Sequence, residues 1–183
     1  MSIVDHNSFE NRSSWYALVT RSRQEKLVAA TLGRLDVPAF LPLITETHLW
    51  SDRKKAVTVP LFAGYLFVRI PAHDEFLLRV LKTPGVVRFV GNHHGPHAIP
   101  DKEIEDVRSV LSEKVVCSPY PFLKTGDRVR IVDGAMKGLE GTLIGRGPES
   151  KLVVSIELIQ RSLAMSIYGF NVEPIVYAHG FAA

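Results

Sequence analysis

The sequence predicts an α+β fold with two domains. Segments typical of strands and of helices interleave along the first part of the chain, without the long crossover spacing that a parallel sheet requires. Beyond Pro119 and Pro121 the apolar residues recur with a period of two. A chain of 183 residues accommodates one or two domains. We therefore expect an N-terminal antiparallel sheet flanked by helices, followed by a small C-terminal β domain.

Apolar periodicity predicts three helices in the N-terminal domain. They are expected at residues 23–35, at 74–82 and from residue 101 onward. Ser22 and Glu25 have the spacing of a capping box at the start of the first helix. Leu77, Val80 and Leu81 of the second helix are expected to face inward. The acidic first turn of the third helix suits the positive end of the helix dipole.

The most informative segment is Pro60–Val68, which we expect to be one continuous strand because it is rich in aromatic and β-branched residues. Phe62, Tyr65 and Phe67 provide more aromatic surface than core packing alone requires. A central strand that is apolar on both faces remains the alternative. Before this segment, strands at 40–50 and 56–60 are expected to be joined by a basic turn at 51–55.

The C-terminal domain is expected to be an SH3-like barrel of short strands. The predicted strands cover residues 126–131, 139–144, 151–158 and 162–168. The domain boundaries are expected at 14–115 for the first domain, 116–122 for the linker and 123–178 for the second domain, after a disordered leader at 1–13. In the loop 133–138, Met136 lies beside Lys137, where it either serves protein recognition or fills the end of the barrel.

Charge and composition exclude several classes of function. The formal net charge is only +3, and each half of the chain is nearly neutral, so protein partners are more plausible than tight binding to free nucleic acid. Cys117 is the only cysteine, which excludes an internal disulfide and a thiolate metal cluster. His93, His94 and His97 lie among glycines and a proline, so no metal site is expected. We find no catalytic motif and no membrane-spanning run, and we expect a cytoplasmic monomer that is not an enzyme and needs no cofactor.

Four segments in this order resemble the NusG/RfaH family of transcription elongation factors. They are Trp15-Tyr16, Pro60–Val68, Thr83–Gly91, and the run Gly126–Ile131 with Gly134, Lys137-Gly138 and Gly141. The resemblance implies an N-terminal domain that binds RNA polymerase and a C-terminal KOW domain that recruits a second factor, namely a small-subunit ribosomal protein or Rho. Ala63-Gly64-Tyr65 replaces the usual Pro-Gly-Tyr of the general factor, which favours a specialised paralogue.

The resemblance also assigns roles to individual residues. The surface for the polymerase clamp helices maps onto Phe62, Tyr65, Phe67 and Phe89. The gate-loop contact maps onto Phe76, Leu77 and Leu78, where some relatives carry a small polar motif, so this contact is either apolar or absent. Contacts with the non-template DNA strand map onto Arg21, Arg34 and Arg79, and the partner site of the KOW domain maps onto Met136 and Lys137.

Two functions remain possible at this stage. One is a transcription elongation and antitermination factor that suppresses pausing or termination. The other is a general RNA- or ribosome-binding KOW module without a role on polymerase. The aromatic residues of 60–68 lie among aliphatic rather than basic residues, which favours a pocket for a protein helix over a surface for stacking bases. In one branch of the family the C-terminal domain is stored as a helical hairpin, but the alternation in 152–158 predicts a β state here.

Overall fold

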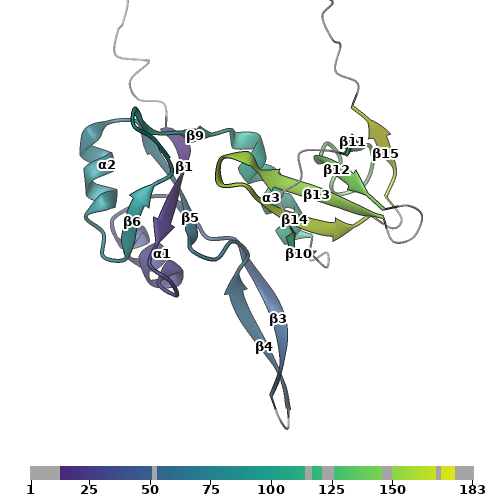
Figure 1. Cartoon of the computed structure of the whole chain (residues 1–183), viewed down its shortest axis with the longest axis horizontal. Helices are drawn as coiled ribbons and strands as arrows, with labels where there is room; N and C mark the ends of the chain where they lie inside the picture. Colours follow the sequence, from purple (N-terminus) through teal and green to yellow (C-terminus); the bar gives the residue numbers. More distant parts are fainter. Residues whose placement is uncertain are drawn as a thin grey trace, which may run out of the picture. The chain divides into compact units, whose positions relative to one another are not determined.

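The computed structural model describes residues 13–50, 53–113, 117–120, 126–145, 150–167 and 170–175. The chain divides into two compact units. The first comprises residues 1–105 together with 156–160, and the second comprises 106–155 and 161–183 (Figure 1). The domain boundaries expected from the sequence, 14–115 and 123–178, stay a prediction.

The first unit is built on a five-stranded antiparallel sheet in which β1 is central. The strands are β1 (Ser13–Thr20), β2 (Ala39–Phe40), β5 (Tyr65–Pro71), β6 (Val86–Phe89) and β9 (Ala98–Ile99). Their order is β2-β5-β1-β6, and β9 pairs with β1 beside this path. Leu18 of β1 lies opposite Leu66 of β5 on one side and Phe89 of β6 on the other, so these three residues share one face of the sheet.

Helices α1 (Glu25–Arg34) and α2 (Asp74–Leu81) cover that face. The core between sheet and helices is formed by buried aliphatic and aromatic side chains, including Leu18, Leu66, Val28, Leu32 and Val80. The third helix, α3 (Asp101–Ser112), buries Ile104, Val107 and Val110. The three predicted helices are therefore present, with ends within about two residues of those expected.

Two details of the predicted helices are wrong. The residue before α1 is Gln24 and makes no capping hydrogen bond through its side chain, so Ser22 and Glu25 do not form a capping box. Leu81 is 40% exposed rather than inward-facing, because Val80 occupies the centre of the buried face and Leu81 falls at its margin.

The segment 60–68 is not one continuous strand. Strand β4 (Arg53–Pro60) ends at Pro60, and β5 begins only at Tyr65. A turn separates them, in which the Tyr65 N–H donates to the Phe62 carbonyl at 3.1 Å. Gly64 has φ of 81°, a left-handed conformation that glycine adopts without strain. The aromatic residues predicted for one strand are therefore divided between a turn and a strand.

Strands β3 (Leu43–Trp50) and β4 form a separate two-stranded hairpin, and β7 (Gly91–Asn92) with β8 (Gly95–Pro96) forms a much shorter one. In Figure 1 the β3–β4 hairpin extends away from the sheet of the first unit. The basic residues 53–55 lie on β4, paired with 48–50, and not in the turn where the sequence placed them. The pairing of β3 with β4 therefore extends further toward the tip of the hairpin than the polar residues of 51–55 predicted.

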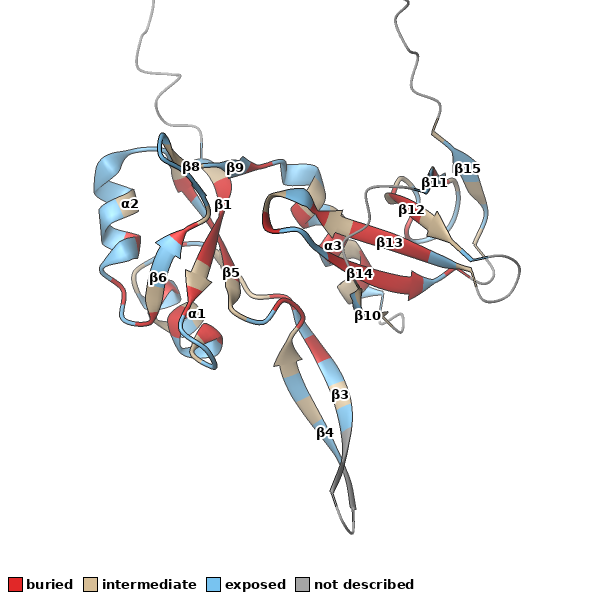
Figure 2. Ribbon diagram, in the orientation of Figure 1, coloured by how far each residue is buried: buried red, intermediate tan, exposed pale blue. Residues whose placement is uncertain are grey.

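The second unit contains a six-stranded antiparallel sheet. Its strands are β10 (Cys117–Tyr120), β11 (Asp127–Ile131), β12 (Glu140–Ile144), β13 (Lys151–Ile156), β14 (Arg161–Ser166) and β15 (Val172–Pro174), in the order β10-β14-β13-β12-β11-β15. Between β13 and β14 the chain forms a short 3-10 turn, η2 (Glu157–Ile159), whose residues are grouped with the first unit. Figure 2 shows that β13 and β14 are largely buried, as their aliphatic sequences require. The predicted β state of this region is confirmed.

Strand β10 lies within the segment that the sequence assigned to the linker. The prolines there were expected to exclude regular structure, yet Pro119 pairs with Leu163 of β14. Strand β10 is at the end of the strand order, where a residue without an N–H is tolerated because one side of the strand needs no partner. The observed architecture is α+β with antiparallel sheets, as predicted, while closure into an SH3-like barrel stays a prediction.

Candidate protein-binding surfaces

An aromatic row lies on the face of the first sheet opposite α1 and α2. Phe67 is paired with Ala17 of β1 and with Phe40 of β2, so its side chain points away from the helix-covered core. Its ring centroid is 6.1 Å from that of Phe40 and 6.2 Å from that of Phe62, and Phe40 is 6.5 Å from Trp15. We call Trp15, Phe40, Phe67 and Phe62 the aromatic row.

Most of the aromatic row is interior. Phe62 is 2% exposed and Phe67 is fully buried, because each packs edge-to-face against the other. Both side chains are interior in this structure, and their predicted contact with the clamp helices stays a prediction. Tyr65, the third aromatic residue of this segment, is half-buried and is the one that retains accessible surface.

Phe89 does not lie on the same face of the sheet as Phe67. It lies opposite Leu18, on the helix-covered face of the sheet, and its ring meets Tyr16 at 6.1 Å in an edge-to-face contact. Phe67 lies on the other face. Because successive residues of a strand point to opposite faces of a sheet, Phe89 lies in the core cluster on the face away from Phe67. Its predicted role in the clamp site stays a prediction.

Glu25 makes a contact that could not be predicted from the sequence. Glu25 is 5% exposed, and its Oε1 accepts a hydrogen bond from the Gly64 N–H at 2.8 Å, across 39 positions of sequence. The Gly64 carbonyl in turn accepts the Thr20 N–H at 2.9 Å. The turn before β5 is thus bonded to both the start of α1 and the end of β1.

Arg69 was likewise not among the candidate residues predicted from the sequence. Its guanidinium lies 5.9 Å from the Trp15 ring centroid, in a cation–π arrangement, and pairs with Asp101 at 3.0 Å. Both charged side chains are about half exposed, so the ion pair contributes little stability. It does place a cation at the margin of the aromatic row.

Helix α2 presents apolar side chains to solvent. Phe76 is 37% exposed and Leu78 is 52% exposed, whereas Leu77 packs against the core. Leu77 packs against the core cluster that contains Val80, and its part in the predicted gate-loop contact stays a prediction. Phe76 and Leu78 have the accessibility that such a contact requires.

The three arginines predicted to face DNA have different surroundings. Arg21 and Arg34 are exposed, before and at the end of α1 respectively. Arg79 is also exposed, but its Nη2 donates to the Leu35 carbonyl at 2.6 Å, which connects α2 to the end of α1. The Arg79 side chain therefore has a structural partner, and this contact places it close in space to the segment that carries Arg34.

Met136 is not exposed. It is 2% exposed and belongs to the core of the second unit, which corresponds to the second interpretation of its sequence, that it fills one end of the sheet. Backbone hydrogen bonds close the loop. The Gly138 N–H donates to the Ile131 carbonyl at 2.8 Å, and the Lys137 N–H donates to the Gly134 carbonyl at 3.2 Å. Lys137 is the exposed member of the pair, and the predicted contact of Met136 with a partner stays a prediction.

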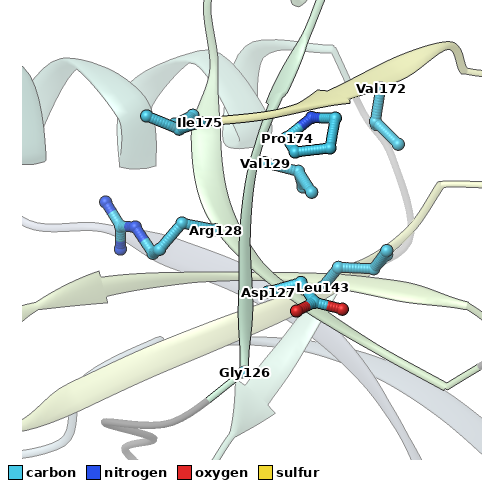
Figure 3. A pocket seen from close by; sticks show the side chains of 8 residues that line it. All are labelled: Gly126, Asp127, Arg128, Val129, Leu143, Val172, Pro174 and Ile175. Carbon is cyan, nitrogen blue, oxygen red and sulfur yellow. The ribbon is translucent and has the colours of Figure 1, made fainter. Parts of the chain in front are cut away.

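The second unit also contains an open hollow of about 570 Å³ between β11, β12 and β15 (Figure 3). It is lined by Gly126, Asp127, Arg128, Val129, Leu143, Val172, Pro174 and Ile175. In Figure 3 the Arg128 side chain extends to the other side of β11 from Val129. The lining is mainly aliphatic, with one carboxylate and one guanidinium.

Within the part of the chain that the structure describes, no three His, Cys, Asp or Glu side chains are placed to hold a metal ion. His93 and His94 stack on each other at 3.8 Å in the short β7–β8 hairpin. Burial raises the pKa of the Cys117 thiol, so this thiol is a weaker nucleophile at neutral pH than an exposed one. None of the described helices is long and apolar enough to span a membrane.

The fold and these surfaces define a two-unit α+β protein whose candidate sites are surfaces for macromolecules. Residues 13–108 match the family model described as "Transcription termination factor nusG". That match spans more than half of the chain. The chain therefore belongs to the NusG family of transcription termination and antitermination factors.

Similar proteins agree with this assignment, and a solved structure agrees with the fold. The transcription termination/antitermination protein NusG of Lactococcus lactis is 28% identical over 183 residues, which covers 93% of this chain and 98% of the relative. The NusG protein of Streptococcus pyogenes is 30% identical, covering 71% and 79% respectively. A solved structure described as "Domain interaction in Thermotoga maritima NusG" covers 90% of this chain and 98% of its own, with a TM-score of 0.54 and 22% identity. That structure supports the fold alone.

Proposed function

We propose that this chain is an elongation and antitermination factor that binds RNA polymerase through its first unit and recruits a second factor through its second unit. The observation that carries the proposal is the match of residues 13–108 to the NusG family model, which spans nearly the whole first unit. Partner-binding surfaces commonly centre on an aromatic anchor, and Tyr65 is a half-buried aromatic residue at the start of β5, two residues before Phe67. In this proposal Tyr65 contacts the clamp helices.

The proposed gate-loop contact uses Phe76 and Leu78 of α2. Both are exposed apolar side chains, and exposed apolar groups on one helix are typical of a protein-binding surface. Because this surface is apolar, we expect it to contact an apolar rather than a polar segment of polymerase. The replacement of the usual Pro-Gly-Tyr by Ala63-Gly64-Tyr65 favours a specialised paralogue that acts on particular operons.

Arg21 and Arg34 are proposed to contact the non-template DNA strand. A few phosphate contacts give only weak, salt-sensitive binding to free DNA, in agreement with the net charge of +3. Attachment to polymerase raises the effective concentration of DNA, so the same contacts become significant in the elongation complex. The expected result is suppression of pausing without tight binding to free DNA.

In the second unit we propose that Lys137 lies in the surface that recruits a small-subunit ribosomal protein or Rho. Lys137 is exposed beside the exposed Ala135, on a loop that its own backbone hydrogen bonds hold in shape. A preorganised loop loses less conformational entropy when it binds a partner.

The proposal is tested with the full chain by co-purification with RNA polymerase and by pausing assays on assembled elongation complexes. Tyr65→Ala is expected to weaken polymerase binding by roughly tenfold or more, as truncation of an aromatic anchor does. Tyr120→Ala is the matched control, because Tyr120 is also half-buried but lies on β10 of the second unit. A chain that binds ribosomal RNA but not polymerase would instead support the general RNA-binding alternative.

A further inference from the structure

Glu25 is the one charged side chain among the described residues that the structure buries, at 5% exposed. Burial of a carboxylate is costly unless hydrogen bonds replace its contacts with water. Its Oε1 receives the Gly64 N–H at 2.8 Å, and charge-assisted hydrogen bonds of this kind are about twice as strong as neutral ones. Glu25 also lies in the first turn of α1, where the helix dipole favours a negative charge.

The partner of Glu25 is held from two directions. The Gly64 N–H donates to Glu25, and the Gly64 carbonyl accepts the Thr20 N–H at 2.9 Å. Gly64 has φ of 81°, while no atom lies within 4 Å of the position that a Cβ would occupy. The backbone dihedral, rather than a lack of space, therefore requires glycine, and the two hydrogen bonds hold this turn in place.

This turn sets the position of Tyr65 at the start of β5. Phe62, two residues before Gly64, accepts the Tyr65 N–H through its carbonyl and packs its ring against Phe67. Tyr65, directly after Gly64, is the first residue of β5. A change at the Gly64 peptide therefore moves the backbone on both sides, and Tyr65 moves with it.

We propose that Glu25 is a positioning residue for partner binding, because its carboxylate holds the Gly64 turn and thereby orients Tyr65 toward the protein partner. This inference rests on the proposed role of Tyr65 in binding polymerase. Glu25 acts through the backbone of Gly64 and does not itself contact the partner, since it is buried.

The test compares Glu25→Ala with Glu25→Gln in the full chain. Alanine removes the acceptor, so polymerase affinity is expected to fall roughly tenfold, the effect of losing one charge-assisted hydrogen bond. Glutamine keeps an oxygen acceptor without the charge, so its affinity is expected to stay within about threefold of the parent. Glu173→Ala is the matched control, because Glu173 is exposed on β15.

Amide hydrogen exchange at Gly64 gives a second measurement that does not depend on polymerase. Exchange is expected to be faster by about tenfold or more in Glu25→Ala than in Glu25→Gln, since exchange reports local opening. If the parent chain does not bind polymerase, the proposed function fails, while the exchange data still show whether Glu25 holds the turn. If Glu25→Ala loses protection at Gly64 and yet binds polymerase like the parent, the positioning role is wrong.

Gly64→Ala tests the same turn with Glu25 intact, in case Glu25→Ala does not fold. Alanine is strained at positive φ, so this variant is expected to shift the turn and weaken polymerase binding. Glu25 and Gly64 act through one turn, so the double variant is expected to bind only slightly more weakly than the weaker single variant. Fully multiplicative losses would show that the two residues act independently and would overturn the proposal.

Discussion

The turn 61–64 of the first unit and the loop 132–139 of the second unit both contain a large apolar residue and a glycine in the left-handed conformation. Both segments were expected to present that apolar residue to a partner. In each, the structure buries it instead, with Phe62 and Met136 both 2% exposed. What remains accessible is the neighbouring residue, Tyr65 in one case and Lys137 in the other. In both segments, a large apolar residue in a tight turn packs into the core, and a residue close to it in sequence stays accessible.

The largest expected effect is that of Phe67→Ala, which tests whether Phe67 is a core residue while Tyr65, two residues earlier in β5, is accessible. Phe67 is fully buried between Phe40 and Phe62, so truncation leaves a cavity and is expected to lower the free energy of unfolding by about 3–5 kcal/mol. Denaturant unfolding measures this. Tyr65→Ala is the comparison and should cost clearly less stability, because Tyr65 is only half-buried. Near-wild-type stability of Phe67→Ala would show that Phe67 is a surface residue after all.

Met136→Ala tests the same principle in the second unit. Its side chain is almost fully buried, so the free energy of unfolding is expected to fall by about 2–4 kcal/mol. Lys137→Ala should leave stability within about 0.5 kcal/mol of the parent while it weakens binding of the second factor. Thermal unfolding and a pull-down with the small-subunit ribosomal protein or Rho measure these two effects. A Met136 variant with unchanged stability and lost binding would reverse the assignment.

Alanine substitutions at two glycines test how backbone conformation affects stability. Gly64→Ala forces alanine to positive φ and is expected to cost about 1–2 kcal/mol of stability. Gly33→Ala has open space and ordinary helical backbone in α1, so it is expected to stabilise the chain by about 0.5–1 kcal/mol. Chemical denaturation of both variants checks the opposite signs. Two changes of the same sign would contradict the conformational argument.

The smallest expected change in stability distinguishes Arg79 from Arg34. Arg79→Ala removes the hydrogen bond to the Leu35 carbonyl and is expected to cost about 1 kcal/mol of stability. Arg34→Ala should cost almost none, because Arg34 is exposed at the end of α1. In pausing assays the order is expected to reverse, with an Arg21/Arg34 double alanine variant losing more activity than Arg79→Ala. Equal pausing by the double variant and the parent would exclude the proposed DNA contacts.

The α+β class, the three helices and most strands of the second unit were predictable from the sequence, because hydrophobic periodicity reports local secondary structure directly. The alternation of Val129 and Ile131 with Arg128 and Arg130, for example, matches the burial pattern of β11. The break in segment 60–68 was less predictable. Its composition favours a strand throughout. In the structure, the pairing of β5 with β1 starts only at Tyr65, which lies opposite Val19, so the residues before Tyr65 are not part of β5.

The surroundings of the candidate site residues could be predicted from the sequence only in part, and one physical reason applies to each residue. Which face of the sheet receives Phe89 depends on its register with Leu18, and the burial of Phe62 depends on Phe67 and its neighbours in space. Glu25 has the sequence spacing of a local cap, yet its carboxylate bonds to Gly64, 39 residues away. The sequence by itself determined the family, the class of fold and the polar or apolar character of each segment. Only the tertiary structure decided which aromatic side chains are core and which are surface, because burial is set by contacts between residues that are distant in sequence.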